Sequence, residues 1–324
     1  MDKKSRHLPK VLQVFAEALG AAVSGHTLLI PEEFGRGYCS GFIFNAHIRM
    51  LIMNYELKDK VIVDDFNFEI PSDVVVFKFQ NVIDKKEKLD AEKLVKDIPS
   101  VLMITGGIKA DALEIHTNKQ VLNIEVDTKY LKGFIEVPER SAALQSLLLS
   151  TQPLLFEQMI TAPLQKIVDE IMTNVVDEVF KLFFLRVKAE ELICRLLMEL
   201  LKREETRIYP LMDIDVEHIY KVRERILKNL DTPPVIAELA AFANVSTSKL
   251  KYLFKQIFGD SIYNYYQRFR MQEAARLLRE EKLSVADAGY RLGFSNLSHF
   301  SRLFESHLGE KPKKYSGAGS DYPN

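Results

Sequence analysis

The sequence predicts an α+β protein with a β-rich N-terminal part and an all-α C-terminal domain. Three observations support this fold class. Short apolar runs separated by turn residues fill residues 26–136, as expected for strands. From about residue 142 onward the apolar residues recur at helical spacing. Near the C-terminus, a pattern of two short helices joined by a tight turn occurs twice.

At 324 residues, the chain is long enough for two domains. We expect a β-rich domain with a short N-terminal helix at 1–140, a helical linker region at 141–214, a domain with two helix-turn-helix units at 215–317 and a flexible tail at 318–324. Many short, evenly spaced strands are typical of a sandwich or a small barrel. The expected strands are Thr27–Ile30, Gly41–Asn45, Ile48–Tyr55, Lys60–Val63, Val74–Phe79, Ser100–Ile104, Ala112–Ile115 and Val121–Val126.

The second helix-turn-helix pattern, at residues 285–304, is the most informative segment of the chain. Gly293 suits a turn that needs a positive φ, and Ser295 or Asn296 can cap the helix that follows it. Phe300 and Phe304 then recur at helical spacing and are expected to face inward. The residues between them are left on an exposed face, which has the shape to enter a DNA major groove.

The same pattern occurs once upstream, at residues 236–254, followed by Gly259. The second helices of the two units correspond at an offset of 50 residues and the first helices at 49, so the second turn is one residue longer. Residues 262–279 between the units are rich in Arg, Gln and Ala and predict one longer connecting helix.

Two such units on a connecting helix resemble the AraC/XylS family of bacterial transcription regulators. The resemblance spans roughly residues 215–317 and includes the closing Gly309-x-x-Pro312-x-x-Tyr315. Gly289 stands where the family usually has Ala, which is expected to loosen that helix. Ser316 stands where an Arg usually follows the Tyr, which removes one expected backbone contact.

The resemblance implies that the outward residues near the start of each second helix read DNA bases. Arg can pair with guanine, Asn with adenine, and Leu can contact a thymine methyl group. The alternative is that these are ordinary exposed residues. The base-reading candidates are Thr247, Ser248, Lys251, Tyr252, Asn296, Leu297, Ser298, Ser301 and Arg302. The phosphate-contact candidates, each of which is equally well explained as a solvated charge, are Lys255, Arg268, Arg270, Lys313 and Lys314.

The charge distribution agrees with a DNA-binding C-terminal domain. Residues 215–320 hold 17 Lys and Arg against 12 Asp and Glu, a net charge of +5, whereas residues 1–214 hold 27 against 32, a net charge of −5. A basic domain beside an acidic one suits a nucleic-acid reader joined to a domain with another role. Ordinary scatter of surface charge is the alternative.

The resemblance further implies a jelly-roll, cupin-like sensor domain at the N-terminus, a homodimer, a small-molecule effector and RNA polymerase as candidate partners. A helix over about 178–203 carries an apolar stripe that can form the dimer interface, pack on its own β domain, or do both. The stripe consists of Leu185, Ala189, Leu192, Leu196 and Leu200. The aromatic and polar residues that could line an effector pocket, or serve simply as core, are Tyr38, Phe42, Phe44, His47, Arg49 and Tyr55.

The remaining features argue against catalysis and against export. Cupin-type enzymes generally hold a metal through a His-x-His pair, but His26, His47 and His116 are widely separated, so we expect no metal, no cofactor and no catalytic residues. The rival hypotheses are a cupin-like enzyme fused to a DNA-binding tail and an architectural DNA protein. Two distant cysteines, no signal-peptide pattern and no apolar run of membrane-spanning length predict a cytoplasmic protein without a membrane segment.

Overall fold

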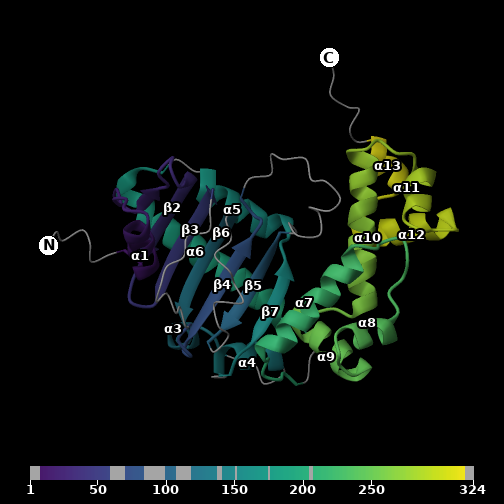
Figure 1. The fold of residues 1–324 in the computed structure, drawn as a ribbon, viewed down its shortest axis with the longest axis horizontal. Helices are drawn as coiled ribbons and strands as arrows, with labels where there is room; N and C mark the ends of the chain where they lie inside the picture. Colours follow the sequence, from purple (N-terminus) through teal and green to yellow (C-terminus); the bar gives the residue numbers. More distant parts are fainter. Residues whose placement is uncertain are drawn as a thin grey trace, which may run out of the picture. The chain divides into compact units, whose positions relative to one another are not determined.

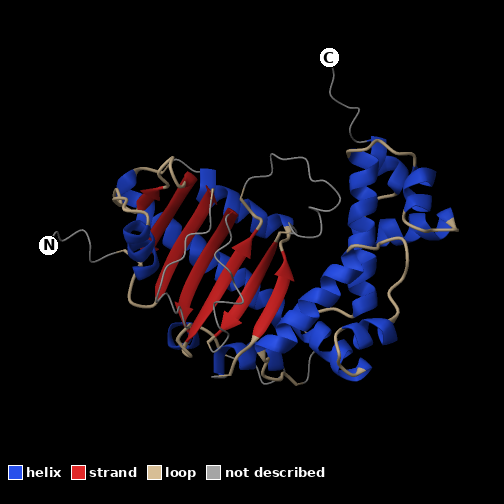
Figure 2. Ribbon diagram, viewed as in Figure 1, coloured by secondary structure: helices blue, strands red, loops and turns tan. Residues whose placement is uncertain are grey.

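The computed structural model describes residues 8–58, 70–83, 99–106, 118–136, 141–149, 152–173, 176–203 and 207–317. Two compact units make up the chain, Met1–Ile214 and Asp215–Asn324. Figure 1 labels most of their elements, and Figure 2 shows that the described strands all belong to the first unit, whereas the second is helical. The fold is therefore of the expected mixed α+β class. Within the described ranges, no helix is both long enough and apolar enough to cross a membrane.

The described strands of the N-terminal unit form one seven-stranded sheet with the order β1-β2-β3-β6-β4-β5-β7. Each pair of neighbouring strands is antiparallel. The strands are β1 (Thr27–Leu29), β2 (Gly35–Ile43), β3 (Ile48–Leu57), β4 (Val74–Gln80), β5 (Ser100–Thr105), β6 (Asn118–Asp127) and β7 (Leu155–Met159). The expected strands at Lys60–Val63 and Ala112–Ile115 lie outside the described residues.

The described strands do not confirm the jelly-roll expectation, because they form one sheet covered by helices and not two stacked sheets. Helices α4 (Ala142–Leu149), α5 (Ala162–Thr173) and α6 (Glu178–Leu201) share one core with the alternate strand residues that include Phe77 and Phe156. Helix α1 (Lys10–Ala18) packs on the opposite face, and α3 (Thr128–Lys132) follows β6. The segment 141–214, expected to be a helical dimerisation and linker region, supplies β7 and three helices to the N-terminal core.

Helix α6 was expected to present a dimer interface, and the structure corrects the residues assigned to it. Asp177 caps the helix, since its side chain accepts a hydrogen bond of 3.0 Å from the Val179 amide. The predicted stripe of Leu185, Ala189, Leu192, Leu196 and Leu200 is buried in the core under the sheet. Helical spacing shows that one face of a helix is apolar, but it does not show what covers that face. The stripe is therefore not available to a second protomer.

Seven helices form the described part of the C-terminal unit, residues 215–317, with the first of them beginning at Asp213. They are α7 (Asp213–Leu227), α8 (Ile236–Phe242), α9 (Thr247–Phe258), α10 (Ile262–Arg279), α11 (Val285–Arg291), α12 (Leu297–Leu308) and α13 (Pro312–Gly317). Helix α10 contacts α9 of the first unit and α11, α12 and α13 of the second. The connecting helix predicted at 262–279 is present with those bounds.

Candidate nucleic-acid interface

The two helix-turn-helix units have the same construction. Helix α8 corresponds to α11 at an offset of 49 residues, and α9 corresponds to α12 at 50, with equal lengths in each pair. Side chains cap both second helices: Ser246 accepts a hydrogen bond from the Lys249 amide at 3.1 Å, and Asn296 accepts one from the His299 amide at 3.0 Å. A glycine in the left-handed conformation ends each of them, at Gly259 and at Gly309.

The turns between the helices meet the same backbone requirement with different residues. Asn244 has a φ of 52° and Gly293, its counterpart at an offset of 49, has a φ of 75°. Asn is one of the few residues with a side chain that tolerates this region. In the second turn the space is also closed, because a Cβ added to Gly293 would lie 2.0 Å from the carbonyl oxygen of Asp231. Only glycine fits there.

Gly289 has a packing role that its residue type alone did not reveal. Helix α11 forms over Val285–Arg291 with Gly289 inside it, and a Cβ there would lie 2.8 Å from Cδ2 of Leu297 and 3.2 Å from Cδ1 of Phe300. The glycine therefore allows the two helices of the unit to approach closely. The expectation that it loosens the helix overlooked this contact.

The base-reading candidates form two groups, one exposed to solvent and one half-buried. Six of them are exposed at or near the N-terminal turns of α9 and α12, where a recognition helix meets base edges: Thr247, Ser248, Lys251, Asn296, Ser298 and Arg302. Tyr252, Leu297 and Ser301 are half-buried. The Tyr252 hydroxyl donates a hydrogen bond of 2.9 Å to Gln256, and Leu297 packs beside Gly289. Both of these side chains are thus partly committed to the fold.

A family model described as a helix-turn-helix domain matches residues 239–318, the segment with this geometry. The HTH-type transcriptional regulator GbdR of Pseudomonas aeruginosa is 32% identical over 85 residues, which cover 26% of this chain and 23% of the relative. The arabinose operon regulatory protein of Escherichia coli is 31% identical over 80 residues, which cover 25% of this chain and 27% of the relative.

The C-terminal domain is an AraC-type helix-turn-helix domain.

Among solved structures, the C-terminal domain of AraT, a response regulator from Geobacillus stearothermophilus, is 27% identical, with a TM-score of 0.31. That match covers 33% of this chain and 91% of the other. The curated relatives described above are matched over about a quarter of their length, so the likeness concerns the AraC-type domain and not the N-terminal unit.

One of the five phosphate candidates, Arg270, is corrected by its surroundings in the AraC-type domain, and a second, Arg268, already has an acidic partner. Arg270 is buried, donates a hydrogen bond of 2.9 Å to the Leu292 carbonyl, and lies 3.7 Å from the ring centroid of Phe294. Arg268 is paired with Asp260. Burial lowers the pKa of both guanidinium groups from the usual value. Lys255, Lys313 and Lys314 are exposed and keep their candidacy.

Helix α10 joins the halves of the AraC-type domain through buried contacts. Met271 and Ala274 share a core cluster with Phe300 and Phe304 of the recognition helix α12. The Tyr266 hydroxyl donates a hydrogen bond of 3.0 Å to the Leu230 carbonyl, and burial raises its pKa to about 12. The hydroxyl therefore stays protonated as a donor near neutral pH. These contacts fix α12 relative to α10.

Sequence reasoning missed one exposed residue on the recognition surface, His299 in the first turn of α12. At the offset of 50, His299 corresponds to Lys249 of α9, and this correspondence could have identified His299 as a candidate. Lys249 itself forms an ion pair of 2.7 Å with Asp215, so it is less available than His299 for a contact with DNA. His299 joins Ser298 and Arg302 as a candidate for contact with DNA.

The effector-pocket candidates of the N-terminal unit fall on two faces of the sheet. Tyr38 and Phe42 line a pocket, and Phe44 stacks on Phe42 with a centroid distance of 6.4 Å. Arg49 and Tyr55 are odd-numbered residues of β3, whereas Ile52, which is even-numbered, lines the pocket. Because side chains alternate along a strand, Arg49 and Tyr55 lie on the opposite face and are excluded from this site.

Arg49, Tyr55, His47 and His26 do not line the pocket, and each has a contact with another residue of the unit. Arg49 pairs with Glu125 at 3.1 Å, and Tyr55 stacks on Phe15 with a centroid distance of 5.2 Å. Nδ1 of His47 lies 3.4 Å from Oδ2 of Asp127, and Nδ1 of His26 lies 3.2 Å from the Gly41 carbonyl oxygen. In the described ranges, no three His, Cys, Asp or Glu side chains gather as metal ligands do. His116 lies outside those ranges.

Proposed function

We propose that this chain is a sequence-specific, DNA-binding transcription regulator that works by binding and recruitment. The observation that carries the proposal is the pair of equivalent helices α9 and α12, each with an exposed polar face at its N-terminal turn, in one AraC-type domain. Each monomer sets both helices into successive major-groove segments on one face of the duplex. The lysines Lys255, Lys313 and Lys314 contact phosphates, and RNA polymerase is the partner that recruitment requires.

We assign to the N-terminal unit the regulatory and dimerising roles, in the cytoplasm. Its exposed apolar surface supports a dimer: Val179, Phe180, Phe183 and Val187 recur on one face of α6 and are exposed. We call these four residues the α6 patch. A second copy of the chain is the proposed occupant, because a two-fold contact can cover the same patch on both protomers at once.

Selection of bound sequences from random DNA tests the proposed function. We expect the full-length protein to enrich a specific duplex, with affinity that falls steeply as salt rises because lysines and arginines displace condensed counterions. The +5 charge of residues 215–320 and the exposed recognition helices motivate this result. Failure to enrich any sequence at low salt would exclude a sequence-specific regulator.

Substitutions at Arg302 and at Lys313 distinguish sequence specificity from general affinity for DNA. Arg302→Ala is expected to cost about 1–3 kcal/mol and to relax the preference at one base position, because a bidentate contact to guanine is lost. Lys313→Ala is expected to weaken all sequences equally and to reduce the salt slope by about one unit. Binding titrations on the selected site and on single-base variants give both quantities.

The matched control is Arg302→Lys, which keeps the charge but not the planar fork of donors. It is expected to preserve the salt slope while losing the base preference. If Arg302→Ala weakens every sequence alike, or if Lys313→Ala alters base preference, the two assignments are wrong.

A further inference from the structure

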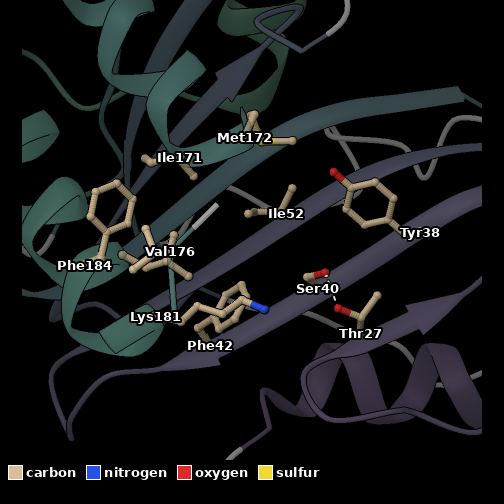
Figure 3. Close-up of a pocket in the computed structure, with 11 residues that line it drawn as sticks. Thr27, Tyr38, Ser40, Phe42, Ile52, Ile171, Met172, Val176, Lys181 and Phe184 are labelled. Carbon is tan, nitrogen blue, oxygen red and sulfur yellow. Dashed lines mark hydrogen bonds between the residues drawn. The ribbon is translucent and has the colours of Figure 1, made fainter. Parts of the chain in front are cut away.

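The N-terminal unit contains a cavity of about 340 Å³ between the sheet and the helices α5 and α6. Figure 3 shows its walls. Strands β1, β2 and β3 supply one side, and Ile171, Met172 and Val176 together with the first turns of α6 supply the other. Its size is at the lower end of the range for small-molecule sites. The space therefore suits a small ligand.

Hydroxyl groups gather on the strand side of this cavity. Oγ1 of Thr27 and Oγ of Ser40 are hydrogen-bonded to each other at 2.8 Å, and Tyr38 of β2 lies on the same wall. A bond between two hydroxyls uses one of their two hydrogens, so the pair still has a hydrogen to donate. The strand wall thus offers a donor to a ligand oxygen.

Lys181 is the charged residue of the cavity lining. In Figure 3 its side chain extends from α6 toward the strand residues Ser40 and Thr27. Its ammonium group pairs with Glu178 at 3.2 Å, and the side chains of Lys181 and Glu178 are 41% and 75% exposed. Because the pair is exposed, it holds the ammonium only weakly, and an anion entering the cavity can take the place of Glu178.

The rest of the lining is apolar. Phe42 and Ile52 come from the sheet, and Phe184 and Leu185 come from α6. Phe42 is itself held by ring contacts with Phe44 at 6.4 Å and with His26 at 5.1 Å between centroids. Walls of this kind bury a hydrocarbon or aromatic body, while the few polar groups orient one end of it.

We propose that this cavity binds a small amphipathic monocarboxylic acid, with its carboxylate between Lys181 and the Thr27–Ser40 pair and its apolar body against Phe42 and Phe184. One ammonium group matches one negative charge, whereas a phosphate dianion would need more cations than the lining supplies. This proposal deepens the regulatory role proposed for the N-terminal unit. An effect of the acid on DNA binding rests on that proposed role, whereas binding of the acid itself is inferred from the cavity alone.

The ligand also has a structural route to the proposed dimer surface. Lys181, Phe184 and Leu185 of the cavity lie in the same turns of α6 as Phe180 and Phe183 of the α6 patch. Occupancy fixes these turns against the sheet, so an effect on self-association is expected as well. That effect is a second readout and not the evidence for binding.

Calorimetric titration of the full-length protein tests the proposal. The probes are hexanoate and phenylacetate, the neutral phenylacetamide and the cationic phenethylamine. We expect at least one acid to bind with one site per chain, and phenylacetate to bind at least tenfold more tightly than its amide. Lys181→Met is expected to weaken the acid at least tenfold and to abolish the difference between acid and amide.

Lys202→Met is the matched control, because Lys202 also pairs with a Glu three residues away on the same helix, Glu199 at 2.7 Å, but does not line the cavity. It should leave binding unchanged. Absence of binding by both acids, equal binding of acid and amide, tighter binding of the amine, or equal losses in the two lysine variants would each overturn the proposal. DNA selection with the same protein remains informative whatever the titration shows, so the two proposals fail separately.

Discussion

Replacing Leu192 and Leu196 together by Glu will unfold the N-terminal unit. Both leucines are 0% exposed and pack under the sheet in the core that α6 shares with α4 and α5. Burying an unpaired carboxylate costs on the order of 4 kcal/mol or more at each position. The pair therefore removes most of the 5–15 kcal/mol that typically stabilises a native protein. Circular dichroism and thermal melting will show the loss of strand and helix signal.

The control is the corresponding double change in the α6 patch, Phe180→Glu with Phe183→Glu. These side chains are 61% and 69% exposed, so the carboxylates remain hydrated and the fold is expected to survive. Under the proposed dimer, sedimentation will report a folded monomer. A dimer that persists in this variant would place the interface elsewhere, and a folded Leu192→Glu, Leu196→Glu variant would contradict the core packing described for α6.

Gly293→Ala is expected to have the next largest effect. The residue has a φ of 75°, and an added Cβ would lie 2.0 Å from the Asp231 carbonyl oxygen, so the backbone of the turn must move. Gly309→Ala provides a matched comparison: its φ is 78°, but no atom lies within 4 Å of an added Cβ. Gly309→Ala should lower the free energy of unfolding only by the penalty that alanine has in the left-handed conformation, about 1–2 kcal/mol. Gly293→Ala should cost at least twice as much.

Denaturant titration of the two variants measures this difference. Because Gly293 sits between α11 and α12, its replacement is also expected to weaken binding to the selected DNA, whereas Gly309→Ala should bind normally once folded. Equal losses of stability in the two variants would show that the turn yields without strain and that the close contact with Asp231 has no energetic consequence.

The AraC-type domain could be predicted closely because its signals are local. Turn residues, caps and apolar spacing occur within a few residues of one another, and they fixed α11, α12 and their counterparts. Arg270 was misassigned because its partners are not local: its side chain reaches the Leu292 carbonyl, and charge alone does not distinguish a buried donor from a phosphate contact. The packing role of Gly289 was missed for the same reason, since it depends on Leu297.

The N-terminal unit was less predictable because the order of strands in its sheet depends on contacts between residues that are far apart in the sequence. Alternation revealed individual strands but not the insertion of β6 between β3 and β4, nor the return of β7 to the sheet edge after α4. The same limit applies to the cavity. Tyr38 and Phe42 were found as aromatic residues on a strand, but Lys181 and Phe184 reach the site only through the packing of α6 on the sheet.

The two helix-turn-helix units share their capping positions and helix lengths, but their candidate base-reading residues differ. Lys251 and Tyr252 in α9 correspond to Ser301 and Arg302 in α12 at the offset of 50. The monomer thus carries two similar units with different candidate base-reading residues, so the two halves of its proposed binding site differ in base sequence. Such a site reads differently in its two orientations, and the bound monomer has a polarity along the duplex. A promoter can therefore encode the direction in which the protein faces, as well as the place where it binds.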